Sequence, residues 1–164
     1  MAEASRVLIL MRHGKSAYPD DVPDHERPLA RRGLREAALA GDWIRATQPP
    51  VDAVLCSTST RTRLTLDATG IDAPAEFSDL LYGATPAQVL HEIAGTKPDV
   101  TTLLVIGHDP GIPGAATALD PRSRYADRIS DKFPTSALAT LTIVGGWSSI
   151  HSAGAALTAF HIPR

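Results

Sequence analysis

Three short apolar runs, each followed at once by polar residues, constrain the fold of this chain more than any other feature. They cover residues 7–11 (VLILM), 53–56 (AVLC) and 101–107 (TTLLVIG). Runs of this kind are typical of strands that are covered on both faces of a sheet. Helical patterns separate the runs, and this alternation predicts an α/β fold with helices on both faces of a mostly parallel sheet.

The segments between and after these runs predict the remaining elements. Residues 31–46 carry Leu34, Ala37, Ala38, Gly41 and Ile44 at helical spacing and are followed by two prolines. Further helices are expected over residues 61–69, over residues 86–94, and over the small residues after position 111. The segment 77–86 is ambiguous between strand and loop. Residues 120–134 are expected to form a loop, and the last two strands to cover residues 137–144 and 156–162.

Length and composition are those of one ordinary globular unit. The 164 residues are 43% hydrophobic and 21% charged, which predicts a single domain over residues 1–164. The net charge of −2 gives no general attraction to nucleic acid or to an anionic membrane. The first apolar run is too short for a membrane span, and a single cysteine, Cys56, favours a reducing cytoplasm.

The polar residues that follow the three apolar runs are the candidate functional residues. They are Arg12 and His13 after the first run, Ser57 and Arg61 after the second, and His108 and Asp109 after the third. In an open α/β sheet, ligands bind beyond the carboxyl ends of the strands. If the three strands are neighbours, these side chains converge on one site.

A site with two arginines and two histidines suits phosphate. Guanidinium groups match phosphoryl oxygens in bidentate geometry. A neutral imidazole nitrogen can attack phosphorus, and arginines can balance the charge of the transferring group without a metal ion. The sequence also lacks the spacings of the common phosphate-loop, zinc and calcium motifs. Cys56 lies in an apolar run without a phosphate-cradling loop after it, so we interpret it as a core residue.

At these residues the chain resembles the histidine phosphatase superfamily, and more narrowly the small SixA-type phosphohistidine phosphatases. The stretches that carry the resemblance are Leu10-Met11-Arg12-His13-Gly14, Arg27-Pro28-Leu29, Arg32-Gly33, Cys56-Ser57 with Arg61, Leu81-Tyr82 and Val105-Ile106-Gly107-His108. They span nearly the whole chain in the family's order. One departure follows Arg61, where relatives often have a Gln-Thr pair and this chain has Leu64-Thr65.

The resemblance implies a phosphoglycerate mutase-like fold, a three-layer α/β/α sandwich. It implies that His13 is the phosphorylated nucleophile and that Arg12, Arg61 and His108 bind the transferring phosphoryl group. No cofactor and no metal are expected. The implied substrate is a phosphorylated protein carrying phosphohistidine, or else a small phosphorylated molecule.

Four more residues are expected to contact the substrate or the nucleophile. Gly14 would let backbone approach behind His13, and a backbone acceptor there could accept a hydrogen bond from the second imidazole nitrogen and so fix the tautomer. Lys15, Ser16 and Arg27 lie on the loop over the same edge and could contact phosphate.

The proton donor is left open between Asp109, Asp79 and no donor at all. Asp109 resembles the aspartate of a His-Asp pair in the acid phosphatase branch, but it could instead cap the following helix. Asp79 lies near the position where larger branches carry a glutamate. A phosphohistidine substrate weakens the need for a donor, since imidazole can be protonated before it leaves.

Two other functions are compatible with the same residues. A mutase would return the phosphoryl group to a bound sugar or glycerate, but it usually needs longer lids than this chain offers. A non-catalytic module would bind a phosphorylated ligand without turnover, although binding alone needs no poised nucleophile.

Overall fold

The three apolar runs form neighbouring parallel strands inside a six-stranded sheet. The computed structural model describes residues 5–152 and 154–164. The strands are β1 (Ser5–Arg12), β2 (Ala53–Ser57), β3 (Ala75–Ser78), β4 (Thr102–Gly107), β5 (Leu138–Val144) and β6 (Gly154–His161). Their order is β3-β2-β4-β1-β5-β6, with parallel pairing from β3 to β1 and antiparallel pairing of β5 with both β1 and β6. The mostly parallel sheet is therefore confirmed.

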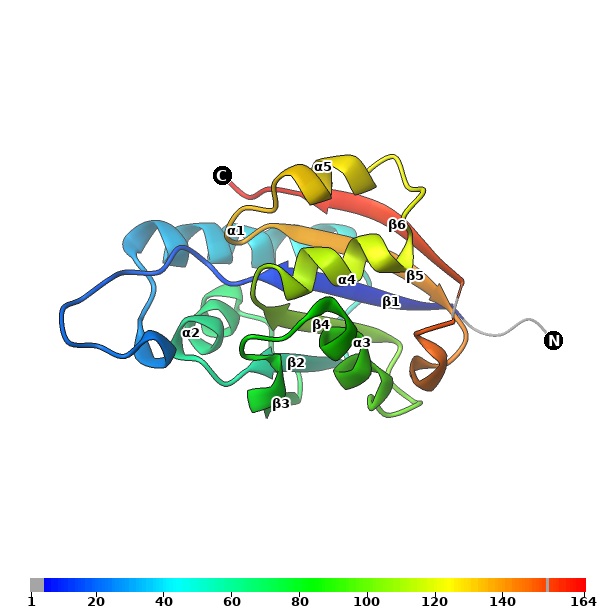
Figure 1. Ribbon diagram of the computed structural model, residues 1–164, viewed down its shortest axis with the longest axis horizontal. Helices are drawn as coiled ribbons and strands as arrows, with labels where there is room; N and C mark the ends of the chain where they lie inside the picture. Colours follow the sequence, from blue (N-terminus) through cyan, green and yellow to red (C-terminus); the bar gives the residue numbers. More distant parts are fainter. Residues whose placement is uncertain (1–4, 153) are drawn as a thin grey trace.

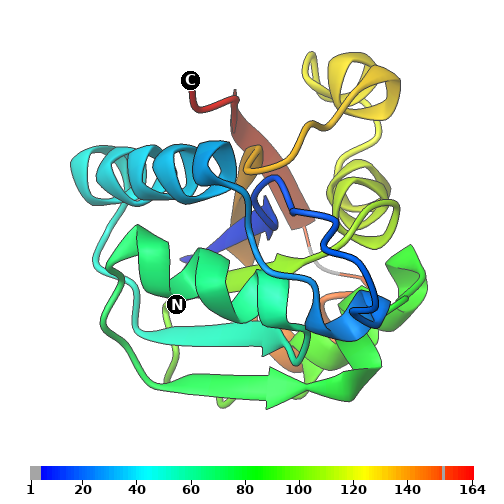
Figure 2. The ribbon, with the colours of Figure 1, turned by 90° about the vertical axis from the view of Figure 1, so that its left-hand side faces the viewer.

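Helices cover both faces of this sheet, as Figures 1 and 2 show. Helices α1 (Arg31–Thr47) and α2 (Thr60–Thr69) lie on one face, where Ala40, Ile44 and Leu66 pack on Ile9 and Ile106. Helices α3 (Pro86–Ala94), α4 (Gly111–Leu119) and α5 (Ala126–Asp131) lie on the other, over a second apolar cluster. The expected three-layer arrangement is confirmed.

The structure resolves one detail that the sequence interpretation left open and corrects two others. The ambiguous segment begins inside β3 and continues as a 3-10 turn (Asp79–Leu81). The expected loop over residues 120–134 contains α5, a helix too short for a clear periodic pattern. Leu34 is 45% exposed, because α1 turns its small residues inward.

Two glycines on α1 allow its backbone to lie close to the backbone of neighbouring segments. A Cβ atom at Gly33 would lie 2.2 Å from the carbonyl oxygen of Lys15, and one at Gly41 would lie 2.0 Å from that of Thr69. Neither position can hold a side chain without movement of backbone. Gly33 thus holds the loop after β1 against α1, and Gly41 holds α1 against α2.

Strand register brings the three polar clusters to one edge. Arg12 pairs with Gly107, and both Met11 and Cys56 pair with Ile106. Residues 13, 57 and 108, which follow these pairs, consequently lie side by side at the carboxyl ends of β1, β2 and β4. The loop from residue 13 to residue 30 extends over this edge, at the left in Figure 1. None of the helices in the described ranges is long and apolar enough to cross a membrane.

Candidate active site

A pocket of about 240 Å³ lies at the carboxyl edge of the sheet. Its lining residues are Arg12, His13, Lys15, Ser16, Tyr18, Arg27, Arg61, His108, Asp109 and Thr135. Of the candidates from the sequence, Ser57 and Asp79 are outside this lining, and eight of the other nine are in it. The ninth, Gly14, contributes its backbone directly behind His13.

His13 is held by backbone with one imidazole nitrogen free. Its Nδ1 lies 2.7 Å from the carbonyl oxygen of Gly14, and the residue is only 8% exposed. A carbonyl can only accept, so Nδ1 carries the proton and Nε2 has its lone pair available. Burial lowers the pKa of His13 to about 3, and the positive charges of Arg61 and Arg12 act in the same direction. The imidazole is therefore neutral at physiological pH.

Thr65, which directly follows the departure from the family pattern at Leu64, supports His13 from behind. The amide of Gly14 donates to Oγ1 of Thr65 at 2.9 Å, and that hydroxyl donates to the carbonyl oxygen of Arg61 at 2.7 Å. Thr65 is fully buried. The sequence interpretation assigned no role to Thr65, because a threonine on a helix gives no signal that it will meet backbone 51 residues away.

His108 faces His13 across the pocket. The two ring centroids are 5.2 Å apart, and Nε2 of His108 lies 2.9 Å from Oγ of Ser57. Burial, together with the charge of Arg61, lowers the pKa of His108 to about 4. Both histidines are thus neutral, and the positive charge of the pocket comes from arginine and lysine.

Arg12 and Arg61 are each anchored from one side. Nη1 of Arg12 donates to the carbonyl oxygen of Phe133 at 2.9 Å. Nη1 of Arg61 donates to the carbonyl oxygen of Asp24 at 2.7 Å, and Nη2 lies 3.1 Å from the Asp24 carboxylate. The Nε atoms of both arginines are buried without a hydrogen-bond partner among the described residues. Buried donors of this kind call for an acceptor, which a phosphoryl oxygen would provide.

Asp24 connects the loop to this pocket, and the sequence interpretation missed it. Its carboxylate accepts from Arg61, from Arg27 and from the hydroxyl of Tyr82. The hydrogen bond from Tyr82, followed by Arg61, lowers the pKa of Asp24 to about 2. No periodicity marks this loop, so an acidic residue there gives no sequence signal of its contacts.

The remaining substrate-binding candidates form the outer wall. Nη1 of Arg27 donates to Oγ of Ser16 at 2.8 Å, and its guanidinium lies 4.1 Å from the ring centre of Tyr18. Lys15 lies beside them in the pocket lining. Ordered contacts on both sides of Arg27 set it apart from a freely solvated surface arginine.

The two candidate proton donors differ in position. Asp109 lies in the pocket lining, and its carboxylate has no hydrogen-bond partner in the part of the chain that the structure describes. Helix α4 has Pro110 as its N-cap and no side-chain cap, so Asp109 does not act as the helix cap considered above. Asp79 accepts from Oγ1 of Thr58 at 2.6 Å and is not in the lining.

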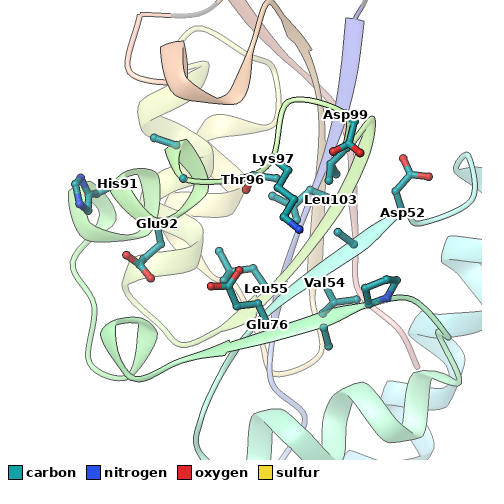
Figure 3. Close-up of a pocket in the computed structure, with 16 residues that line it drawn as sticks. Asp52, Val54, Leu55, Glu76, His91, Glu92, Thr96, Lys97, Asp99 and Leu103 are labelled. Atoms are coloured by element: carbon teal, nitrogen blue, oxygen red, sulfur yellow. The ribbon is translucent and has the colours of Figure 1, made fainter.

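A larger hollow of about 930 Å³ lies elsewhere, near the amino ends of β2, β3 and β4 (Figure 3). Carboxylates surround it, with Asp52, Glu76, Glu92 and Asp99 in its lining, and it contains none of the predicted site residues. Its charge has the wrong sign for phosphate. The charge of the lining residues, and not the volume, therefore makes the smaller pocket the candidate active site. Among residues 5–152 and 154–164, no group of three or more histidine, cysteine, aspartate or glutamate side chains could hold a metal ion.

Fold and pocket together define an α/β phosphate-handling protein, and comparison with known proteins gives the family. The profile of the histidine phosphatase superfamily (branch 1) matches residues 8–109, and the chain belongs to this superfamily. An uncharacterized protein of Mycobacterium tuberculosis is 55% identical over 158 residues, which cover 94% of this chain and all of the relative. An uncharacterized Mycobacterium leprae protein is 46% identical over 161 residues, with the same coverage.

Solved structures agree with the superfamily and indicate a branch. A provisionally assigned phosphohistidine phosphatase SixA from Nakamurella multipartitia superposes with a TM-score of 0.92 at 39% identity, over 99% of both chains. The protein histidine phosphatase SixA in complex with tungstate gives 0.79 at 26% identity, over 96% of this chain and 97% of that one. The chain therefore has the phosphoglycerate mutase-like fold of the SixA structures and is a phosphatase of the SixA type.

Proposed function

We propose that this phosphatase removes phosphoryl groups from protein phosphohistidine through a covalent phosphohistidine intermediate on His13. One observation carries the proposal. The buried, neutral His13 imidazole is fixed by Gly14 with Nε2 unprotonated, in a pocket that Arg12, Arg61 and His108 also line. A nucleophile and the positive charges that its transition state needs are thus assembled in one pocket.

The reaction proceeds in two displacements. In the first, the Nε2 lone pair attacks phosphorus, a P–N bond forms on His13, and the bond to the leaving imidazole breaks as that group takes up a proton. The guanidinium groups of Arg12 and Arg61 stabilise the charge on the equatorial oxygens. In the second, water attacks phosphorus, the P–N bond on His13 breaks, and inorganic phosphate leaves.

The SixA relatives support the substrate class. Tungstate, which binds the SixA protein named above, is a tetrahedral oxyanion like the phosphate group proposed to enter this pocket. A phosphohistidine substrate also does not require a fixed proton donor, because protonated imidazole is a good leaving group. We place the reaction in the cytoplasm, on the ground that the single cysteine favours a reducing compartment.

The test is turnover of a phosphohistidine peptide in excess chelator by the wild type and by His13→Ala. We expect His13→Ala to lower turnover by about a thousandfold or more. His151→Ala, which changes an exposed histidine far from the pocket in sequence, is the matched control. A label from the substrate should remain on the wild-type protein in base and be lost in acid. Activity that survives in His13→Ala would refute the mechanism.

Asp109→Asn separates the two substrate classes. If Asp109 protonates alkoxide leaving groups, this variant loses hydrolysis of phosphoserine peptides and sugar phosphates while it keeps phosphohistidine hydrolysis. Equal losses on all substrates would instead assign Asp109 a structural role. Wild-type preference for sugar phosphates over the phosphohistidine peptide would favour the alternative, a phosphatase of small metabolites.

A further inference from the structure

A groove of about 500 Å³ adjoins the candidate active site and shares Arg12 and Asp109 with it. It lies along helices α4 and α5, which neighbour each other on one face of the sheet (Figure 2), and the segment 132–134 forms part of its wall. The groove thus begins where the phosphate pocket ends. A substrate larger than its phosphorylated group has this space directly beside it.

The surface of the groove is mixed, with prolines and apolar side chains beside the polar residues Thr117, Ser130, Asp131 and Lys132. Pro113, Ile129 and Phe133 are buried side chains in its lining, and Pro86, Pro110 and Pro134 are more exposed. Proline has no amide N–H and a fixed φ, so these residues present carbon surface with few donors. A mixed surface of this kind suits a polypeptide, which carries both apolar side chains and polar backbone groups that need hydrogen-bond partners.

The charges of the groove are balanced, unlike those of the pocket. Asp109 and Asp131 stand against Arg12 and Lys132 in the groove lining. The phosphate pocket instead gathers four cationic side chains, from Arg12, Lys15, Arg27 and Arg61, against the single carboxylate of Asp109. The two spaces therefore suit different parts of one substrate, an anionic group in the pocket and a neutral, partly apolar part in the groove.

Volume supports the same division. The pocket, at about 240 Å³, is below the range of about 300–1,000 Å³ that is usual for sites of drug-sized ligands, whereas the groove is within it. A phosphoryl group on an imidazole ring is small enough for the pocket. The rest of a phosphorylated polypeptide has to lie outside.

Arg12 connects the two spaces physically. Its Nη1 donates to the carbonyl oxygen of Phe133, whose side chain lies in the groove lining, and the same guanidinium lines the phosphate pocket. Contact of a substrate with this wall would consequently help to hold Arg12 in place.

We infer that the groove between α4 and α5 binds the polypeptide that flanks the phosphohistidine of the substrate. The inference rests on the proposed function and deepens it, since it makes the protein, not only the phosphorylated ring, the recognised substrate. Prolines and balanced charges beside a cationic pocket fit such a segment, and they do not fit a second anion.

The test compares a phosphohistidine peptide library with phosphoramidate, the smallest P–N substrate. Thr117→Trp and Ser130→Trp fill the groove from α4 and α5 at positions that are not buried. Ala118→Trp and Asp127→Trp are the matched controls, at exposed positions of the same helices outside the lining. We expect the two groove variants to raise KM for the peptides about tenfold, which corresponds to about 1.4 kcal/mol if KM reports binding. The kcat/KM of the groove variants for phosphoramidate should stay at the wild-type value. Both control variants should keep wild-type KM and kcat/KM with the peptides and with phosphoramidate.

The outcomes separate the two proposals. Equal changes with peptides and phosphoramidate, or no change with either, would overturn the groove inference and leave the proposed function intact. Wild-type protein that hydrolyses neither substrate would overturn the proposed function, and the groove inference with it. Groove variants that selectively lose sugar phosphate hydrolysis would show that the groove serves a small metabolite instead, and would also overturn the inference.

Discussion

At the scale of single residues, burial keeps the imidazole of His13 neutral. Loss of solvation, more than any neighbouring charge, lowers the pKa of the imidazole to about 3. The carbonyl of Gly14 then decides which nitrogen keeps its lone pair. The arginines add positive charge to the pocket and also help to keep the ring neutral.

Thr65→Val tests the support behind the nucleophile. The change keeps the shape of the side chain but leaves the buried amide of Gly14 without its acceptor, which costs about 1–3 kcal/mol. We expect a loss of this size in the free energy of unfolding in urea, together with reduced turnover. Thr47→Val, at an exposed threonine near the end of α1, is the control and should change neither. Wild-type stability and turnover in Thr65→Val would contradict this role of Thr65.

Cys56 provides a second residue-level prediction. The side chain is fully buried, and burial raises the pKa of its thiol to about 12. A thiol in this state reacts slowly with alkylating reagents. Native protein treated with iodoacetamide should keep both its free thiol and its phosphatase activity, as measured by mass spectrometry and turnover. Rapid alkylation with loss of activity would revive a cysteine-based mechanism.

At the scale of elements, the loop after β1 and the helices α1 and α2 shape the pocket by close approach. The Gly33 contact fixes the loop that carries Lys15 and Ser16, and the Gly41 contact fixes α2, which carries Arg61 and Thr65. Elements distant from the reacting atoms thus set the distances between the groups of the pocket.

Gly41→Ala is expected to destabilise the protein. The new Cβ would meet the carbonyl of Thr69 at 2.0 Å, so α1 and α2 must separate. Overpacking of this kind typically costs about 1–3 kcal/mol. Gly95→Ala is the matched control, because its Cβ would make only an ordinary contact at 3.5 Å. Urea unfolding measures both variants, and equal midpoints would show that the helices adjust freely.

At the scale of the whole molecule, the sheet presents both neutral histidines to one buried pocket, and folding is linked to pH through them. The pKa is about 3 for His13 and about 4 for His108, against an ordinary value of 6.5. Between these values and pH 6.5 the unfolded chain binds more protons than the folded one. Their contribution to stability is therefore complete above pH 6.5 and is lost as the pH falls below it.

The melting temperature should accordingly fall between pH 7.5 and pH 5.5. Each histidine accounts for about 1.4 kcal/mol of stability per pH unit below 6.5. Scanning calorimetry of the wild type measures the fall, and His108→Gln, which removes one titrating group, should reduce it. A melting temperature that does not change over this range would contradict neutral histidines in the folded state.

Much of the fold and of the pocket follows from the sequence by itself. Apolar runs of strand length are buried in a sheet that is covered on both faces. The polar residues that follow these runs in the sequence then lie at the carboxyl edge of the sheet. This local logic predicts that Arg12, His13, Arg61 and His108 are neighbours, and all four line one pocket. It also assigned Cys56 to the core, where the structure places it.

Only the tertiary structure decided which distant residues support them. Thr65 meets Gly14, and Asp24 meets Arg61 and Tyr82, because the order β2-β4-β1 brings their loops and helices together. The groove beside the pocket likewise exists only where α5 neighbours α4. Such contacts depend on strand order and helix approach, and these are set by the packing of the whole chain. Hydrophobic periodicity indicates which residues of a segment are buried, but it does not indicate which segments become neighbours.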